Sequence, residues 1–208
     1  MKELLRISVI LLVTSFSMFG QQCMNTPYKL RGYFYVGTAQ KDSLALGGFY
    51  ADKNIPKNAN SSITKLARKG TLNIIAKTDS LVALNQKVQG FKVFIINTSD
   101  SIMELPAQDS RIYLKRQVYY NNKWQDVEYL PSSWCGNSYH SVFIKPDSYW
   151  DLSAPCLTGK IAAKFRFELL TDKNMVLYSN EFAGSFNKSQ LKKEEGYQPQ
   201  GIMDPYSN

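Results

Sequence analysis

Alternation of apolar and charged side chains over residues 160–169 limits the fold of this chain more than any other feature. One parity of the segment is wholly apolar, and the other is mostly charged. The apolar members are Ile161, Ala163, Phe165, Phe167 and Leu169, and the charged members are Lys160, Lys164, Arg166 and Glu168. Because successive side chains of a strand point to opposite faces of a sheet, the pattern predicts a β-strand with one buried and one wet face.

A second alternating segment, residues 111–120, predicts a strand with Ile112, Leu114, Val118 and Tyr120 pointing inward. It ends at two asparagines, which are typical of tight turns, and residues 123–130 are expected to return as the hairpin partner. Residues 91–96 are apolar on both parities, which indicates a central strand covered on both faces. Further strands are expected at residues 72–77, 139–144, 149–153, 175–179 and 181–186.

Many short strands separated by turn signals indicate an all-β fold, and the aromatic content of 13% agrees with it. We predict an immunoglobulin-like Greek-key β-sandwich over residues 71–187, with a closed β-barrel as the alternative. Residues 21–70 are expected to form a less regular N-terminal segment of strands and loops. Residues 188–208 are rich in Lys, Gln, Pro and Gly, which predicts a flexible C-terminal tail.

The first twenty residues predict a secretory signal peptide. Lys2 and Arg6 precede an apolar stretch at residues 7–19, and Gly20 is a small residue before the expected cleavage point. The stretch is shorter than the roughly twenty apolar residues that cross a bilayer, so cleavage is favoured over membrane anchoring. We therefore expect the protein in the periplasm, at the cell surface or outside the cell.

Three cysteines remain after such processing. An oxidising compartment favours pairing of nearby thiols, and the short separation of Cys135 and Cys156 predicts a disulfide between them. Cys23 is then a lipidation site, a free thiol near the N-terminus or the partner in an intermolecular bridge. Residues 20–22 depart from a lipobox, and only lipidation at Cys23 would bring the protein to a membrane.

The composition argues against most catalytic chemistry. The chain has one histidine, no phosphate-cradling loop, no calcium loop and no nucleophile elbow, so we predict no metal site, no cofactor and no catalytic residue. A nucleophilic Cys135 beside His140 is disfavoured, because that cysteine is expected in a disulfide. The formal charge of +8 is scattered along the sequence, and an exported protein is not expected to bind nucleic acid.

Four aromatic residues are candidate contacts for a partner. Trp124 and Trp150 each follow a turn, Tyr120 precedes the turn before Trp124, and Tyr149 directly precedes Trp150. Exposed aromatic rings stack on sugars or anchor protein interfaces, so we predict an envelope-associated or secreted binding module that recognises a protein or a glycan. The alternatives are a secreted glycan hydrolase that uses carboxylates such as Asp126 or Glu128, and a secreted protease inhibitor that uses the loop at residues 130–137.

Residues 90–186 contain the stretches FKVFIINTSDS, EYLPSSWCGNSY and LYSNEFAGSFN, and with them the chain resembles uncharacterised exported proteins of Bacteroidota. The resemblance implies a β-sandwich at the cell surface or in the periplasm, and it brings no catalytic residues. Bacteria of that phylum attach O-glycans at Asp-Ser or Asp-Thr followed by an aliphatic or small residue. Ser43, Ser80 and Ser101 occupy such sequences and are expected O-glycosylation sites.

Overall fold

The computed structural model describes residues 22–47, 53–132, 135–171 and 175–195 of the chain. Regular structure in these residues is mostly β-strand, arranged in several sheets of which none closes into a barrel. The predicted all-β sandwich is therefore confirmed, and the barrel alternative is wrong. The signal peptide predicted for residues 1–20 lies outside the described residues.

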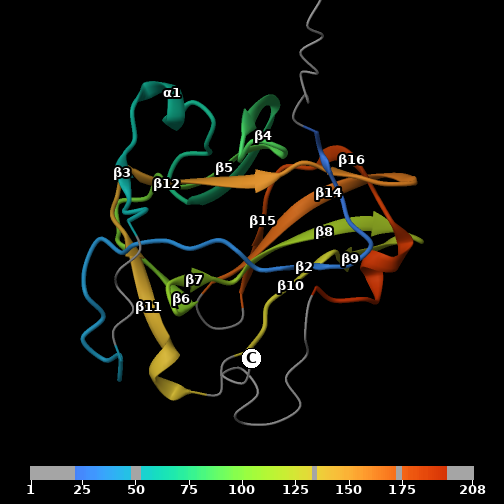
Figure 1. The fold of residues 1–208 in the computed structure, drawn as a ribbon. Coiled ribbons are helices and arrows are strands. Elements are labelled where there is room, and N and C mark those ends of the chain that lie inside the picture. The colour runs from blue at the N-terminus through green and yellow to red at the C-terminus, as the bar shows by residue number, and fades with distance from the viewer. Residues whose placement is uncertain (1–21, 48–52, 133–134, 172–174, 196–208) are drawn as a thin grey trace, which may run out of the picture.

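Two antiparallel sheets form the layers of the sandwich (Figure 1). The first contains, in spatial order, β3 (Lys57–Asn58), β12 (Ser148–Pro155), β5 (Gln89–Asn97) and β4 (Leu72–Ala83). The second contains β15 (Val176–Tyr178), β14 (Ile161–Leu170), β8 (Leu114–Tyr120) and β9 (Lys123–Asp126), with β16 (Phe182–Phe186) also paired to β14. Because β12 returns to pair with β5 and β14 returns to pair with β8, the chain crosses between the layers as in Greek-key folds.

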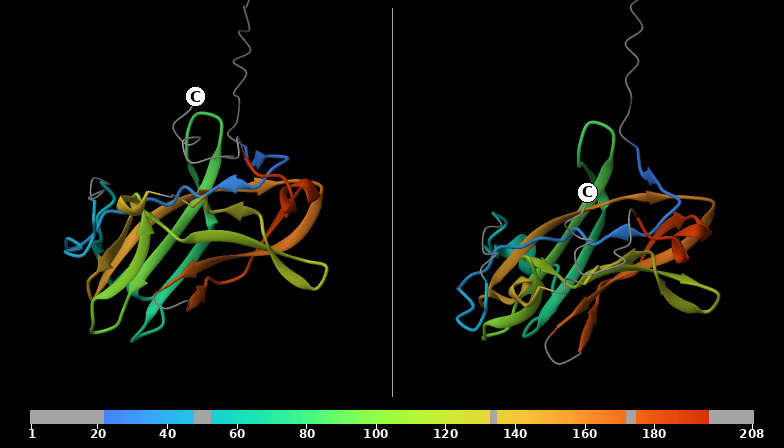
Figure 2. Two further views of the ribbon diagram at one scale, coloured as in Figure 1. Left: turned by 90° about the horizontal axis from the view of Figure 1, so that it is seen from below. Right: turned by 60° about the horizontal axis from the view of Figure 1, so that its bottom comes forward.

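Smaller sheets and helical turns complete the fold. A third sheet contains β11 (Tyr139–Ile144), β6 (Met103–Gln108) and β7 (Arg111–Ile112), and two parallel pairs join β1 (Met24–Asn25) to β13 (Leu157–Thr158) and β2 (Leu30–Arg31) to β10 (Glu128–Tyr129). The helical turns are α1 (Ser61–Thr64), η1 (Gly136–Ser138) and η3 (Lys188–Leu191). Figure 2 shows the end of the β4–β5 hairpin projecting beyond the other strands.

Both ends of the described chain pack onto the sandwich. Phe34 and Val36 of the N-terminal segment are buried in the core between the layers. Regular structure also extends into the segment that the sequence assigned to a flexible tail, because η3 is closed by a capping box between Asn187 and Gln190, and Gln190 is fully buried. Residues 196–208 of the predicted tail lie outside the described residues.

The alternating segments of the sequence form the strands that they predict. β14 buries Phe165, Phe167 and Leu169, while the residues between them face outward. The turn between β8 and β9 has positive φ at both Asn121 and Asn122, 52° and 58°, a conformation that asparagine tolerates and that tight hairpins require. In the described residues, no helix is long and apolar enough to span a membrane.

The disulfide joins Cys23 to Cys156, so the predicted Cys135–Cys156 bond is wrong. β1 pairs with β13 in a register that sets Met24 opposite Leu157, which places the two preceding cysteines side by side, with Cα atoms 4.8 Å apart. Cys135 is an exposed thiol just before η1. Because Cys23 is bonded to Cys156, its sulfur is neither a free thiol nor open to lipidation.

Replacing Cys23 and Cys156 together by serine is expected to lower the free energy of unfolding by about 2–5 kcal/mol, since the bond closes a loop of 133 residues in the unfolded chain. Urea denaturation of the oxidised protein and of the variant measures the difference. Cys135→Ser is the matched control and is expected to leave stability within about 0.5 kcal/mol of the parent. A large loss of unfolding free energy in Cys135→Ser, with no loss in the Cys23 and Cys156 double variant, would contradict the Cys23–Cys156 pairing.

Candidate functional site

A buried ion pair holds β8 against β10. The carboxylate of Glu128 and the guanidinium of Arg116 are almost completely inaccessible, and Arg116 Nε lies 3.2 Å from Glu128 Oε1. Glu128 also accepts hydrogen bonds from the hydroxyl of Tyr33 at 2.8 Å and from the backbone N–H of Arg116 at 2.9 Å. Arg116 Nη2 donates in turn to the Tyr33 oxygen at 3.0 Å. The three side chains therefore form one closed polar network inside the sandwich.

Burial dominates the ionisation of the two acids in this network. It raises the pKa of the Glu128 carboxyl, although the charge of Arg116 and the two donated hydrogen bonds act in the opposite direction. Burial and the nearby carboxylate of Glu128 together raise the pKa of Tyr33 well above its usual range. Tyr33 therefore stays protonated and can donate to Glu128 at physiological pH.

The two carboxylates proposed for a hydrolase lie on opposite sides of the sheet. Asp126 faces outward and accepts hydrogen bonds from Lys115 Nζ at 2.8 Å and from Gln117 Nε2 at 3.0 Å. Glu128 faces inward to Arg116, because the strand is interrupted at the buried residue Val127 between β9 and β10. A glycosidase needs both carboxylates within one cleft, so these two cannot act on the same bond.

The outward side of β8, β9, β14 and β15 carries a row of aromatic rings around an arginine. The guanidinium carbon of Arg166 is 4.2 Å from the ring centroid of Trp124 and 3.6 Å from that of Tyr178. The ring of Tyr119 extends the row, with its centroid 5.3 Å from that of Trp124. Tyr119 and Tyr178 are 42% and 45% exposed. We call these four residues the aromatic face.

Polar side chains beside the aromatic face hold one another in place. Gln117 Nε2 donates to Asp126 Oδ1 at 3.0 Å and to Glu168 Oε2 at 2.9 Å, while Arg166 Nε donates to Gln117 Oε1 at 2.9 Å. Lys115 Nζ lies 2.8 Å from Asp126 and 3.2 Å from Glu168. Burial would lower the pKa of Lys115, but the two carboxylates outweigh it and raise that pKa. The result is a fixed array of hydrogen-bonding groups next to the rings.

Only Trp124 of the four predicted contact residues lies on the aromatic face. Trp150 is fully buried, and its indole Nε1 donates to the Gly37 carbonyl at 2.9 Å, so its expected exposure is wrong. Tyr120 is half-buried against Phe186, on the opposite side of β8 from Tyr119. Tyr149 is half-buried on the first sheet, where its ring packs against Phe94.

His140 serves the structure of the third sheet. It is buried, and its Nε2 accepts the backbone N–H of Ser110 at 2.9 Å. That contact leaves the proton on Nδ1, which lies 3.2 Å from the carbonyl oxygen of Ser141. Ser133 and Trp134, in the loop considered for protease inhibition, lie outside the described residues.

The three serines expected to carry O-glycans are all exposed. Ser43 stands beside Asp42, whose carboxylate ties its loop to β11 by accepting the backbone N–H groups of Leu44 at 2.9 Å and Ser141 at 2.7 Å. Ser80 lies near the end of β4, and Ser101 lies between β5 and β6. Their modification stays a prediction.

The sequence reasoning missed Arg116, Arg166 and Tyr178. A signal for Arg116 was present, because it occupies the inward parity of its strand between Leu114 and Val118. A charge at a buried position requires a buried partner, and Glu128 on the return strand is within reach. No comparable signal marks Arg166 and Tyr178, whose meeting depends on the pairing of β14 with β15.

Within the described residues, no group of histidine, cysteine and acidic side chains could hold a metal ion. No protein-family model, no curated protein and no solved structure matches the chain.

Either charge of the buried pair is expected to be costly to remove alone. Arg116→Met or Glu128→Gln should lower the free energy of unfolding by about 3–5 kcal/mol, because the remaining partner stays buried without its counter-charge. Replacing the whole network, with Tyr33→Phe, Arg116→Met and Glu128→Leu, should cost less, since no buried charge is left and only the backbone N–H of Arg116 loses its acceptor. Urea unfolding of the four proteins checks this, and single variants as stable as the parent would refute it.

Asp42→Asn is expected to destabilise the protein by about 1 kcal/mol at pH 7 and less in acid. Burial alone would raise the pKa of Asp42, but the N–H groups of Ser141, Leu44 and Ala45 outweigh it and lower the pKa. A lowered pKa in the folded state gives stability that is present above the usual aspartate pKa and is lost as the pH falls through the folded-state value. Unfolding of parent and variant at pH 7 and in acid measures the change, with Asp100→Asn as control.

Proposed function

We propose that this protein is a non-catalytic glycan-binding module of the cell envelope or its surroundings, and that the aromatic face is its recognition surface. The observation that carries the proposal is the placement of Arg166 between Trp124 and Tyr178, with Tyr119 beside them. Rings fixed in this way lose little conformational freedom on binding, which favours affinity. The apolar C–H side of a sugar ring packs favourably on the electron-rich face of an aromatic ring.

The polar network supplies the second half of sugar recognition. Gln117, Asp126 and Glu168 are held in one arrangement by their mutual hydrogen bonds. Sugar hydroxyls both donate and accept, so they can bind to amide and carboxylate groups that are already oriented. Lys115 and Arg166 together balance the charges of Asp126 and Glu168, which favours a glycan of low net charge.

A glycan fits this surface better than a protein does. The centres of protein interfaces are depleted of lysine and acidic side chains, whereas here Lys115, Asp126 and Glu168 lie beside the rings. Separation of Asp126 and Glu128 across the sheet argues for binding without cleavage. The signal peptide predicted from the sequence and the disulfide between Cys23 and Cys156 support an oxidising compartment as its location.

Binding of neutral polysaccharides is the direct test. The mature oxidised protein would be run in affinity gels containing glucan, xylan or mannan, and we expect at least one of them to retard it. Trp124→Ala and Tyr178→Ala should each weaken that binding by about tenfold or more, a loss of ~1.4 kcal/mol. Tyr35→Ala removes an equally exposed ring away from the aromatic face and should leave binding unchanged.

The results separate the alternatives. Cleavage of a retained polysaccharide would overturn the proposal that the module is non-catalytic. Unchanged retention of the Trp124→Ala variant would overturn the assignment of the aromatic face as the binding surface. Failure of every polysaccharide to bind, together with a purified protein partner whose binding needs Trp124, would move the function to protein recognition.

A further inference from the structure

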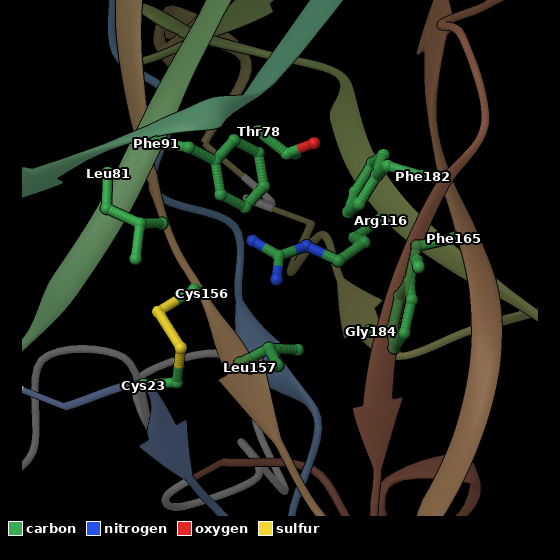
Figure 3. Close-up of a pocket in the computed structure, with 11 residues that line it drawn as sticks. Cys23, Thr78, Leu81, Phe91, Arg116, Cys156, Leu157, Phe165, Phe182 and Gly184 are labelled. Atoms are coloured by element: carbon green, nitrogen blue, oxygen red, sulfur yellow. A yellow bond between two sulfur atoms is a disulfide. The ribbon is translucent and has the colours of Figure 1, made fainter.

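A cavity next to the disulfide, separate from the aromatic face, lies inside the sandwich. A cavity of about 220 Å³ opens there between the two layers. Its walls are mostly apolar: Leu81, Phe91, Leu157, Phe165 and Phe182 line it. Figure 3 shows the guanidinium of Arg116 in the middle of these side chains, with the Cys23–Cys156 disulfide at one side.

Arg116 brings a permanent positive charge into this apolar cavity, since a guanidinium does not lose its proton in proteins. Nε lies 3.2 Å from Glu128 Oε1, and Nη2 donates to Tyr33. The rings of Phe91 and Phe167 lie 5.6 Å and 5.1 Å from the guanidinium carbon. These contacts use the inner edge and the faces of the group, and they leave the Nη1 donors for a ligand.

The arrangement of charge favours an anion. Of the described residues that line the cavity, Arg116 alone is charged, while its counter-charge on Glu128 is not part of the lining. A ligand in the cavity therefore meets the positive end of the buried pair, with the negative end behind it. The hydroxyl of Thr78, also in the lining, can donate a further hydrogen bond.

We infer that the cavity binds a small carboxylic acid with an apolar body, its carboxylate on Arg116 and its chain among the phenylalanine rings. Carboxylates match the planar donors of arginine, and such charge-assisted bonds are strong where water is excluded. Since a water molecule occupies about 30 Å³, the cavity holds roughly seven groups of that size, which suits a chain of about six carbons.

Three six-carbon probes that differ only in their head group test the inference. Hexanoate, 1-hexanol and hexylamine would be titrated into the oxidised mature protein and followed by amide chemical shifts in NMR. We expect hexanoate to bind with a Kd about tenfold or more below that of 1-hexanol, and hexylamine not to bind. The shifts should centre on Leu157, Phe182 and Gly184.

Two sets of variants test whether hexanoate binds in the cavity through the charge of Arg116. Arg116→Gln combined with Glu128→Gln removes both charges and should abolish the preference for hexanoate over 1-hexanol. Should that variant fail to fold, the exposed rim residue Leu81 provides a second test: Leu81→Asp should weaken hexanoate binding at least threefold relative to Leu81→Asn, with 1-hexanol unaffected. Ile102→Asp against Ile102→Asn makes the same charge change at an exposed site outside the lining and should have no effect.

Equal affinity for hexanoate and 1-hexanol would overturn the inference, as would shifts that centre away from the cavity. Equal hexanoate binding by Leu81→Asp and Leu81→Asn would do the same. Trp124→Ala should keep full hexanoate binding, because the aromatic face lies on the other side of β8. The outcome therefore does not depend on whether the module binds a glycan.

Discussion

The buried ion pair of Arg116 and Glu128 is the constraint around which the rest of this sandwich is arranged. Removing two charges from water costs several kcal/mol for each, and the cost is offset only where geometry and hydrogen bonds are good. Here Tyr33 and the backbone N–H of Arg116 complete the bonding of the carboxylate. Tyr33 belongs to the N-terminal segment, so the network ties that segment to the second sheet. The same segment contains Cys23, whose disulfide bond to Cys156 attaches it to the sandwich a second time.

Strand alternation then gives the second sheet two different faces. Arg116 points inward from β8, while its neighbours Lys115 and Gln117 point outward to Asp126 and Glu168. One strand thus serves both the polar network beside the aromatic face and the mostly apolar cavity behind it. The interruption at Val127 makes both possible, because it sends Asp126 outward and Glu128 inward although they are two residues apart. In an unbroken strand both carboxylates would lie on one face.

Local patterns predicted the strands well and the long-range contacts poorly. Residues 160–169 alternate strictly and form β14, and the Asn121-Asn122 turn closes the hairpin as expected. The disulfide could not be predicted from the sequence. The short separation along the chain favoured Cys135 as the partner of Cys156, but the pairing of β1 with β13 brings Cys23 to Cys156 instead. Trp150 follows a turn, as a surface residue often does. However, β12 runs between β3 and β5, and Trp150 is one of the side chains of β12 that point into the core. Burial of that kind is set by neighbouring strands and not by the flanking sequence.

Two arginines on opposite faces of this sheet illustrate how the same side chain takes on different roles. Arg166 lies between Trp124 and Tyr178 in contact with solvent, where its charge stays hydrated and the stacking fixes the rings. Arg116 is buried near the rings of Phe91 and Phe167, so its charge has to be balanced by Glu128. For packing alone, an apolar side chain of similar volume would give equal or greater stability than a buried cation and its partner. The position of Arg116 at a cavity that its counter-charge does not reach is therefore better explained by a ligand than by stability.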